Sequence, residues 1–345
     1  MSMKKIRTAV IGLGRIGWMY HIPEIISHKE FELVSVCDSL PERLSEAKQL
    51  YNANTYSDVD LMLEKESPDL VVVASPTKFH LPHTLAAFRN GCDVFCEKPA
   101  MASTDEMYIV MDAMKQYGRK FMVYQPHRAS ADLQCLKDIL HRGLLGRVYM
   151  IKRTRCDYAR RNDWQAFTEF GGGMLNNYGS HIIDQMLHLA NSPLKKVYCA
   201  TRKIASLGDA DDVVKIVFET ANQMVLDIDI NMASALPVQP WIVFGEYGTA
   251  SLSEDNRIWN VRYFKPAELE TISAKKDLAA KGRSYANGET IKWYSEQFNI
   301  ADYKPLDYYQ QCYRYFVMDE KPLVPCEETM LLMQVLYECK KQAEN

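Results

Sequence analysis

The chain has 345 residues, a length that suits two domains of ordinary size. Its 47% hydrophobic and 25% charged residues are typical of a globular protein, and a net charge of -3 gives no reason to expect a nucleic-acid or membrane partner. No apolar run reaches the roughly 18 residues of a transmembrane helix. The basic start resembles a signal peptide, but its apolar run is short and broken by glycine, which favours a strand. Nine scattered cysteines without a CxxC pair favour reduced thiols and a cytoplasmic location.

Short apolar runs alternate with helical patterns along the first 125 residues. The runs predict buried parallel strands, and the apolar spacing between them predicts helices. We expect strands at 6–11, 32–37, 69–75, 93–99 and 120–124, and helices at 15–27, 58–66, 81–90 and 104–117, with one more beginning at Pro41. This alternation with short connections predicts an α/β Rossmann domain, a parallel sheet with helices on both faces.

A different pattern begins after about residue 125. Helices are expected at 130–142 and 172–190, with a strand at 147–156, and four strand-like runs then follow: KKVYCATRKI, DDVVKIVFE, QMVLDIDI and PWIVFGE. They predict an α+β domain with a large, open, mainly antiparallel sheet. We expect a loop at 275–288 and closing helices at 305–317 and 327–343. The expected domains are 1–126 and 127–345, and the last helix could pack back toward the first domain.

The segment Gly12-Leu13-Gly14-Arg15-Ile16-Gly17 lies between a predicted strand and a predicted helix. There, GxGxxG indicates dinucleotide binding: the glycines allow a tight turn, close approach of a pyrophosphate and close helix–strand packing. Asp38 ends the second strand, where a carboxylate can hold the ribose hydroxyls of NAD. Arg43 is close enough in sequence to accommodate the extra phosphate of NADP. Alternatively, the glycines are ordinary turns and Asp38 is a helix cap.

The ends of the predicted strands at 69–75 and 93–99 should border the same cofactor site, because open α/β sheets bind ligands beyond the carboxyl ends of their strands. Lys98 follows the second of these strands. A lysine at this position can donate to a substrate hydroxyl and stabilise a developing alkoxide, although a lysine is more often a solvated loop residue. We expect the cofactor to be bordered by these residues: Ser75, Pro76, Thr77, His80, Glu97 and Lys98.

Four segments carry a family resemblance: VIGLGRIG, VVVASPTKFH, CEKPAM and GGGMLNNYGSHIIDQMLHL. Together they resemble the Gfo/Idh/MocA family of NAD(P)-dependent sugar and polyol dehydrogenases, over nearly the whole chain. The resemblance implies that the Rossmann crevice faces the second domain and that Lys98 belongs to the catalytic set. It also implies a small sugar or polyol substrate, and a homodimer or homotetramer formed through the open sheet.

The family usually carries an Asp and, four residues later, a His in the helix after the glycines, and this His is the proposed general base. Here the His is His181, but Asn177 replaces the Asp. Because Asn carries no charge, we expect a less basic His181, with Asn177 orienting the ring or binding a substrate hydroxyl. Asp184 shares the helix face and could bind substrate or hold the imidazole. Two alternatives stay open: His181 as a plain core histidine, and a metal site with Asp184 and His188, although the family uses no metal.

Two further residues are candidates for binding substrate. Arg128 lies just past the last Rossmann strand, where the family often places an Arg or Asn near the nicotinamide. Trp164 could stack on the apolar face of a sugar or simply pack in the protein. A basic cluster precedes the glycine-rich motif and fits either a solvated surface or an anionic sugar or sugar phosphate: Arg153, Arg155, Arg160 and Arg161.

The combined prediction is an enzyme that transfers a hydride between a sugar or polyol hydroxyl, or a ketosugar, and NAD, with NADP possible. Lys98 would polarise the oxygen and His181 would take the proton. Two other functions stay open: a glycoside-cleaving enzyme that oxidises its substrate transiently, and a non-enzymatic NAD(P)-binding sugar sensor.

Overall fold

The computed structural model describes residues 5–274, 276 and 289–343. Within them, six parallel strands form sheet A in the order β3-β2-β1-β4-β5-β6. The strands are β1 (Ile6–Ile11), β2 (Phe31–Cys37), β3 (Asn54–Tyr56), β4 (Leu70–Val73), β5 (Asp93–Cys96) and β6 (Phe121–Val123). Every residue of β4 and β6 is buried, as expected for strands that are covered on both faces. The predicted Rossmann sheet is therefore confirmed, and β3 is an additional short strand.

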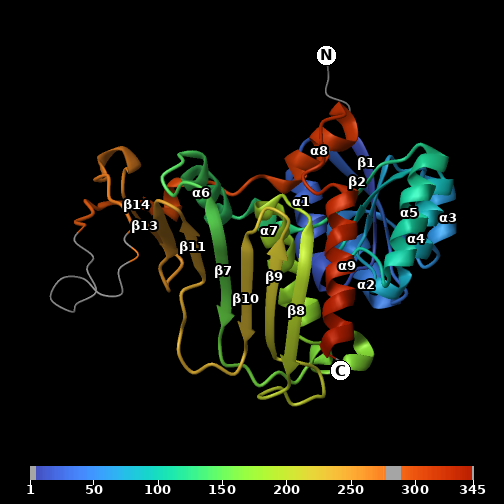
Figure 1. Ribbon diagram of the computed structural model, residues 1–345. Coiled ribbons are helices and arrows are strands. Elements are labelled where there is room, and N and C mark those ends of the chain that lie inside the picture. The colour runs from blue at the N-terminus through green and yellow to red at the C-terminus, as the bar shows by residue number, and fades with distance from the viewer. Residues whose placement is uncertain (1–4, 275, 277–288, 344–345) are drawn as a thin grey trace.

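The helices of this half are α1 (Ile22–Ser27), α2 (Pro41–Tyr51), α3 (Val59–Glu66), α4 (His80–Arg89) and α5 (Thr104–Tyr117). Helices α3, α4 and α5 pack side by side along one flank of sheet A (Figure 1). The sequence sets the ends of α5 directly. The Ser103 hydroxyl accepts the Glu106 N–H at its start, and Gly118 takes the left-handed conformation, with φ +61°, at its end.

The helical segment 15–27 is irregular, because a π-helical turn at Gly17–His21 precedes α1. A second π-helical turn, at Leu175–Gly179, precedes α7 (Ser180–Ala190). The sequence pattern predicts both segments as ordinary helix and does not reveal these turns. Such turns are frequent at functional sites, and the second one carries Asn177.

Sheet B contains eight strands of the described chain, in the order β14-β13-β12-β11-β7-β10-β9-β8. They are β7 (Val148–Cys156), β8 (Leu194–Arg202), β9 (Val213–Thr220), β10 (Val225–Asn231), β11 (Trp241–Gly245), β12 (Gly248–Leu252), β13 (Ile258–Tyr263) and β14 (Tyr294–Asn299). Neighbours pair antiparallel except β7 and β10, which are parallel. The mainly antiparallel sheet is thus confirmed. The sequence did not predict β12, β13 and β14 as separate strands, and most of the expected loop at 275–288 lies outside the described residues.

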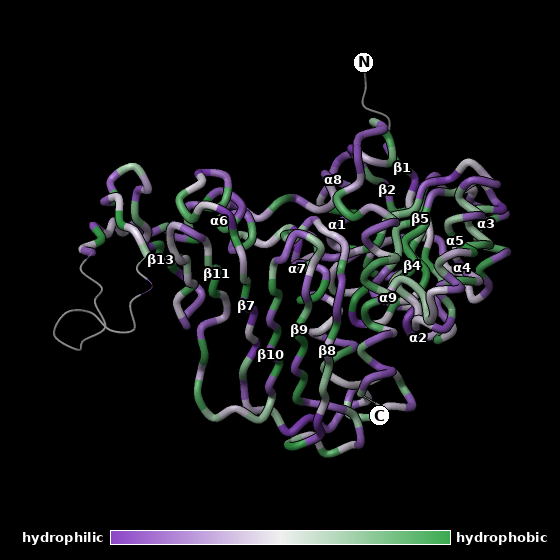
Figure 2. Tube along the Cα trace, in the orientation of Figure 1, coloured by the Kyte–Doolittle hydropathy of each residue, from purple (hydrophilic) through white to green (hydrophobic). Residues whose placement is uncertain are grey.

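Side chains alternate between the two faces of sheet B. Val214, Ile216 and Phe218 of β9 are buried and join a core with α6 (Ala131–His141), α7 and α9 (Cys326–Ala343). On the opposite face Lys215 pairs with Asp227 and Asp229 of β10. Figure 2 shows this alternation of hydropathy along the strands of sheet B, whereas β4 is apolar throughout and β5 is apolar after Asp93.

The C-terminal helix α9 packs against both halves of the molecule (Figure 1). Met330 and Met333 join the apolar core around sheet A, as do the tyrosines of α8 (Tyr308–Met318). Leu336 and Cys339 join the core beneath sheet B. All nine cysteines lie in the described part of the chain as free thiols, and no helix there is long and apolar enough to cross a membrane.

Candidate active site

The glycine-rich loop follows β1, and its three glycines meet different surroundings. A Cβ on Gly12 (φ +96°) would lie 2.6 Å from the backbone of Ala74, and one on Gly17 would lie 2.0 Å from the Gly12 carbonyl oxygen. A Cβ on Gly14 would meet nothing within 4 Å. The loop therefore leaves open space at Gly14, which fits the close approach of a dinucleotide pyrophosphate. The intervening residues differ in exposure: Leu13 is buried, Ile16 half-buried and Arg15 exposed.

Asp38 lies at the end of β2, against this loop. One carboxylate oxygen, Oδ2, accepts the Leu13 N–H at 2.7 Å and lies 3.2 Å from Arg43 Nη1. The other, Oδ1, accepts the Leu40 N–H at 2.9 Å. The carboxylate is in the position from which it could hold a ribose hydroxyl, and the adjacent guanidinium could meet a 2′-phosphate.

The loops after β4 and β5 are joined by His80. Its Nε2 lies 2.7 Å from the Ser75 carbonyl oxygen, and its Nδ1 lies 3.0 Å from that of Pro99. Because His80 is buried and both nitrogens have protein partners, neither is left for a ligand, so the expectation of a direct cofactor contact does not suit this residue. Ser75 and Pro76 lead into a 3-10 turn that begins at Thr77, and the Ser75 hydroxyl lies 3.0 Å from His83 Nδ1.

Lys98 is held from the Rossmann side by Glu97. The buried Glu97 carboxylate accepts the backbone N–H of Lys98 at 3.0 Å through one oxygen and His21 Nε2 at 3.0 Å through the other. The Lys98 Nζ reaches across the crevice and lies 3.5 Å from Asn177 Oδ1. Burial lowers the pKa of Lys98, and the charge of Glu97 opposes that shift. The lysine is therefore not a solvated loop residue.

His181 is buried in α7 and faces the end of β6. Its Nδ1 lies 3.1 Å from Gln125 Oε1, and its ring stacks on His127 with 4.2 Å between centroids and 4° between planes. Since Gln125 Oε1 can only accept, this contact assigns the hydrogen to Nδ1 and leaves Nε2 as a proton acceptor. Burial, and then the charges of Lys98 and His127, lower the pKa of His181, so the imidazole is neutral at pH 7.

Asn177 connects Lys98 to the second half of the molecule. Its Oδ1 faces the ammonium group, and its Nδ2 donates to Gln165 Oε1 at 2.8 Å. Each end of the amide therefore has one protein partner and the capacity for a second hydrogen bond. Trp164, beside Gln165, is 57% exposed on the same loop, so its ring is available to stack on a ligand.

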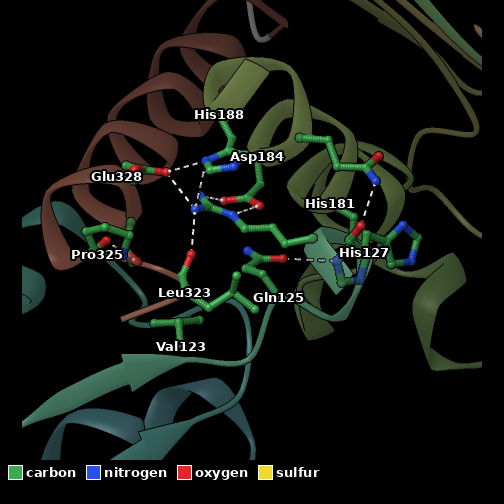
Figure 3. Close-up of polar contacts among 12 residues, drawn as sticks. Val123, Gln125, His127, His181, Asp184, His188, Leu323, Pro325 and Glu328 are labelled. Atoms are coloured by element: carbon green, nitrogen blue, oxygen red, sulfur yellow. Dashed lines mark hydrogen bonds and ion pairs between the residues drawn. The ribbon is translucent and has the colours of Figure 1, made fainter. Parts of the chain in front are cut away.

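Arg128 and Asp184 do not line this crevice, in contrast to the expectation that they bind substrate. The two side chains are each 1% exposed and form a bidentate pair, with distances of 2.6 and 2.7 Å. Arg128 Nη1 also donates to Glu328 at 2.6 Å and to the Leu323 carbonyl at 3.1 Å. Figure 3 shows Asp184, His188, Glu328 and Leu323 converging on this guanidinium, apart from the Gln125–His181 pair. We name Arg128, Asp184, His188, Glu328 and Leu323 the Arg128 cluster. The cluster connects the 3-10 turn at Pro126–Ala129 to α7 and to α9.

Charges within the Arg128 cluster act strongly on one another. Burial alone would raise the pKa of Glu328, but His188 and Arg128 lower it to about 2. His188 is engaged there as well, through Nδ1 to Glu328 at 3.2 Å and through Nε2 to Lys137 at 3.0 Å. With Asp184 and His188 both engaged, the alternative of a metal bound by the helix has no support. Among the described residues, no group of three or more His, Cys, Asp or Glu side chains could hold a metal ion.

Sequence reasoning missed four residues that shape the site: His21, Gln125, His127 and Gln165. His21 and Gln165 hold Glu97 and Asn177, and Gln125 and His127 hold the imidazole of His181. The only sequence signal was that Gln125 and His127 follow the last Rossmann strand. Strand alternation does not say which side chains there point inward.

Two family models match the chain. One, described as "Oxidoreductase family, NAD-binding Rossmann fold", matches residues 6–125, and the GFO/IDH/MocA C-terminal domain matches 133–251. Among curated relatives, the D-glucoside 3-dehydrogenase of Escherichia coli is 32% identical over 57% of this chain and 57% of its own length. The scyllo-inositol 2-dehydrogenase (NADP(+)) IolW of Bacillus subtilis is 26% identical over 54% of this chain and 52% of its own. The chain thus spans little more than half the length of these relatives.

Solved structures agree in fold. An NAD-binding protein from Listeria innocua superposes with a TM-score of 0.83 at 22% identity, covering 99% of this chain and 98% of that one. The WlbA dehydrogenase of Bordetella pertussis, in complex with NADH and UDP-GlcNAcA, gives 0.76 at 22% identity, covering 99% and 97%. With both halves matched by family models and the glycine loop in place, the chain belongs to the Gfo/Idh/MocA family of oxidoreductases, with an NAD-binding Rossmann domain.

Proposed function

We propose that this protein is an NAD-dependent dehydrogenase or reductase acting on the CH–OH group of a sugar or polyol. The observation that carries the proposal is a half-buried lysine, Lys98, held by Asn177 and close enough to the neutral imidazole of His181 for its charge to lower the pKa of that ring. The names of the sugar and inositol dehydrogenases among its relatives support it. In this proposal residues 1–126 bind the cofactor, and residues 127–345 bind the substrate.

The two side chains have separate roles in the proposed reaction. Lys98 donates a charged hydrogen bond to the reacting oxygen, where negative charge develops. His181 accepts the hydroxyl proton at Nε2, because its Nδ1 is occupied by Gln125. When bound, the nicotinamide supplies the hydride acceptor. Asn177 holds the lysine and can accept or donate to a neighbouring substrate hydroxyl, and Trp164 offers an aromatic face to the sugar ring.

Asp38 favours NAD over NADP, since its carboxylate would repel a 2′-phosphate. Arg43, 3.2 Å from that carboxylate, keeps NADP as the second choice. The uncovered face of sheet B, which carries the half-exposed Tyr198 and the Lys215 ion pairs, is the surface that we propose for a homodimer or homotetramer.

The first experiment follows nicotinamide absorbance with NAD⁺ or NADP⁺ and a panel of polyols, aldoses, uronates and sugar phosphates. We expect one class to be oxidised by the wild type and Lys98→Met to lose that turnover. The matched control is Lys115→Met, because the Lys115 side chain on α5 is 78% exposed. Full turnover by Lys98→Met would refute the proposed mechanism.

One observation keeps a second function under test. Asn177 gives His181 no carboxylate partner, so His181 is a weaker base. A weaker base suits an enzyme that oxidises its substrate only transiently and returns the hydride to the product better than it suits a dehydrogenase with continuous net turnover. Glycoside cleavage without net cofactor reduction, measured by product analysis, would identify such an enzyme. Tight NAD binding with no reaction on any substrate would favour a sensor.

A further inference from the structure

A cavity of about 290 Å³ lies beside the proposed active site, at the low end of the range for small-molecule pockets. It is bounded by residues 155–165, the start of the α7 segment and residues 206–212. Gln165 lines the cavity and also accepts a hydrogen bond from Asn177, which faces Lys98. Two side-chain amides, Gln165 and Asn177, therefore connect the cavity wall to Lys98. A substrate that reaches Lys98 with one end can place its other end here.

The carboxylates that line the cavity are already used by the protein. Asp211 accepts the Leu175 N–H at 2.9 Å, and Asp212 accepts the N–H groups of Ile204 and Ala205 at 2.7 and 2.6 Å. Asp163 accepts the Gln165 N–H and pairs with Arg161 at 3.1 Å. These acidic groups hold the walls of the cavity together, and their hydrogen-bonding capacity is directed into the walls.

Two arginines of the lining are only partly satisfied. The Nε of Arg155 is buried and has no hydrogen-bond partner, and its Nη2 lies 3.6 Å from Asp157, a loose ion pair. The side chain as a whole is 41% exposed, and its guanidinium lies 5.1 Å from the centre of the Tyr178 ring in a cation–π contact. Arg160 is exposed at the rim and forms no ion pair with any residue that the structure describes. A buried donor without a partner costs free energy unless a ligand supplies an acceptor.

Positive charges also act on His127, which stacks on His181. Burial, and then Arg153, Lys98 and Arg155, lower the pKa of His127 to about 4, with only Asp132 acting in the opposite sense. An anionic group bound at Arg155 would offset part of this positive potential.

We propose that the substrate is a sugar or polyol that bears a carboxylate or a phosphate, and that Arg155 and Arg160 bind this anion in the cavity while the reacting hydroxyl lies at Lys98. Arginine suits this role because its planar fork can bind two oxygens of either group. The inference rests on the proposed function, since it places the anion relative to that reacting centre.

The test compares glucose, glucuronate and glucose 6-phosphate with the NAD-loaded protein, in both turnover and calorimetric binding. We expect an anionic sugar to be preferred, and Arg155→Met to raise its KM or Kd by about ten- to a hundredfold, the value of a charge-assisted bond. Arg160→Met, at an exposed position that folding does not require, should raise it less. Neither change should alter the neutral sugar by more than about threefold. The preferred anion identifies carboxylate or phosphate as the group bound.

The control is Arg257→Met, since that side chain is 79% exposed and lies in a turn between β12 and β13. A preference for neutral glucose, or equal losses on neutral and anionic sugars in Arg155→Met, would overturn the anion site. Either result would leave the proposed function standing as long as Lys98→Met abolishes turnover. If no sugar turns over, the binding measurements alone decide on the anion site, and the proposed function fails separately.

Discussion

Replacing Arg128 with methionine should destabilise the protein strongly, because the change removes the cation of a buried cluster. Arg128 holds Asp184 through two bonds of 2.6 and 2.7 Å, and both side chains are 1% exposed. Burial raises the pKa of Asp184 even with the guanidinium present, so the carboxylate depends on this partner to remain charged. In Arg128→Met, Asp184 must stay charged without a partner or take up a proton in the core.

The size of the effect follows from that geometry. Removing one partner of a buried ion pair costs about 3–5 kcal/mol. With an entropy of unfolding of about 2.1 cal/mol/K per residue, the 345 residues give about 0.7 kcal/mol/K, so the melting temperature should fall by about 4–7 °C. The double variant Arg128→Met/Asp184→Leu removes both charges and should recover much of this loss, because a buried pair and well-packed apolar residues differ little in stability.

Thermal unfolding and urea titration of the three proteins, the wild type and the single and double variants, test the reasoning. Arg314→Met is the matched control: its ion pair with Glu320 has the same 2.6 Å length as the Arg128–Glu328 pair, but both side chains are more than a third exposed. It should cost about 0–1 kcal/mol. If Arg128→Met were no worse than Arg314→Met, or the double variant no better than the single one, burial of the pair would not set its cost.

Three other outcomes follow from the structure. Gly14→Ala should fold normally but lose NAD binding in a fluorescence titration. Gly17→Ala should instead lower the melting temperature, because its Cβ would lie 2.0 Å from the Gly12 carbonyl oxygen. Equal behaviour of the two variants would contradict the assignment of the glycine-rich loop to pyrophosphate binding. Asn177→Asp should move the pH optimum of kcat/KM upward, since a carboxylate beside the lysine and imidazole favours their protonated forms. An unchanged pH profile would contradict the idea that residue 177 sets the protonation of Lys98 and His181. Although burial lowers the pKa of His28, hydrogen bonds to Asp307 and Glu24 raise it overall, so the stabilisation from this pair is fully present below about pH 6.5 and is lost as pH rises through the raised value. His28→Asn should flatten that fall in urea titrations made at a series of pH values above about 6.5, and an equally steep fall would contradict the assignment.

The sequence predicts five of the six strands of sheet A well, because each of them is a short apolar run with helical spacing beside it. The three residues of β3 fall below any periodic signal, and β12 to β14 alternate polar and apolar residues in runs too short to separate from loops. The parallel pairing of β7 with β10 joins segments about 75 residues apart, so it depends on topology and not on local pattern.

The position of Lys98 at the crevice was predictable because the residue follows a strand end. It was not predictable where packing decides what a polar side chain faces. Arg128 and Asp184 both lie near the crevice in sequence terms, yet they pair with each other, and Glu328, 200 residues from Arg128, completes the cluster. Gln125 and Gln165 are neutral amides whose residue type points to no particular partner, so only the folded structure shows that they hold His181 and Asn177.

The position of α9 limits how the two halves can move. Met330 and Met333 are packed in one core, and Leu336 and Cys339, one or two turns further along the same helix, in the other. A wide hinge opening of the crevice would have to pull one of these sets out of its core. We therefore expect local motions of loops and no wide hinge motion. Cofactor exchange would then depend on rearrangement of the glycine loop and of the loop that carries Trp164. Release of the cofactor should then limit turnover, because a dehydrogenase must exchange its nicotinamide in every catalytic cycle.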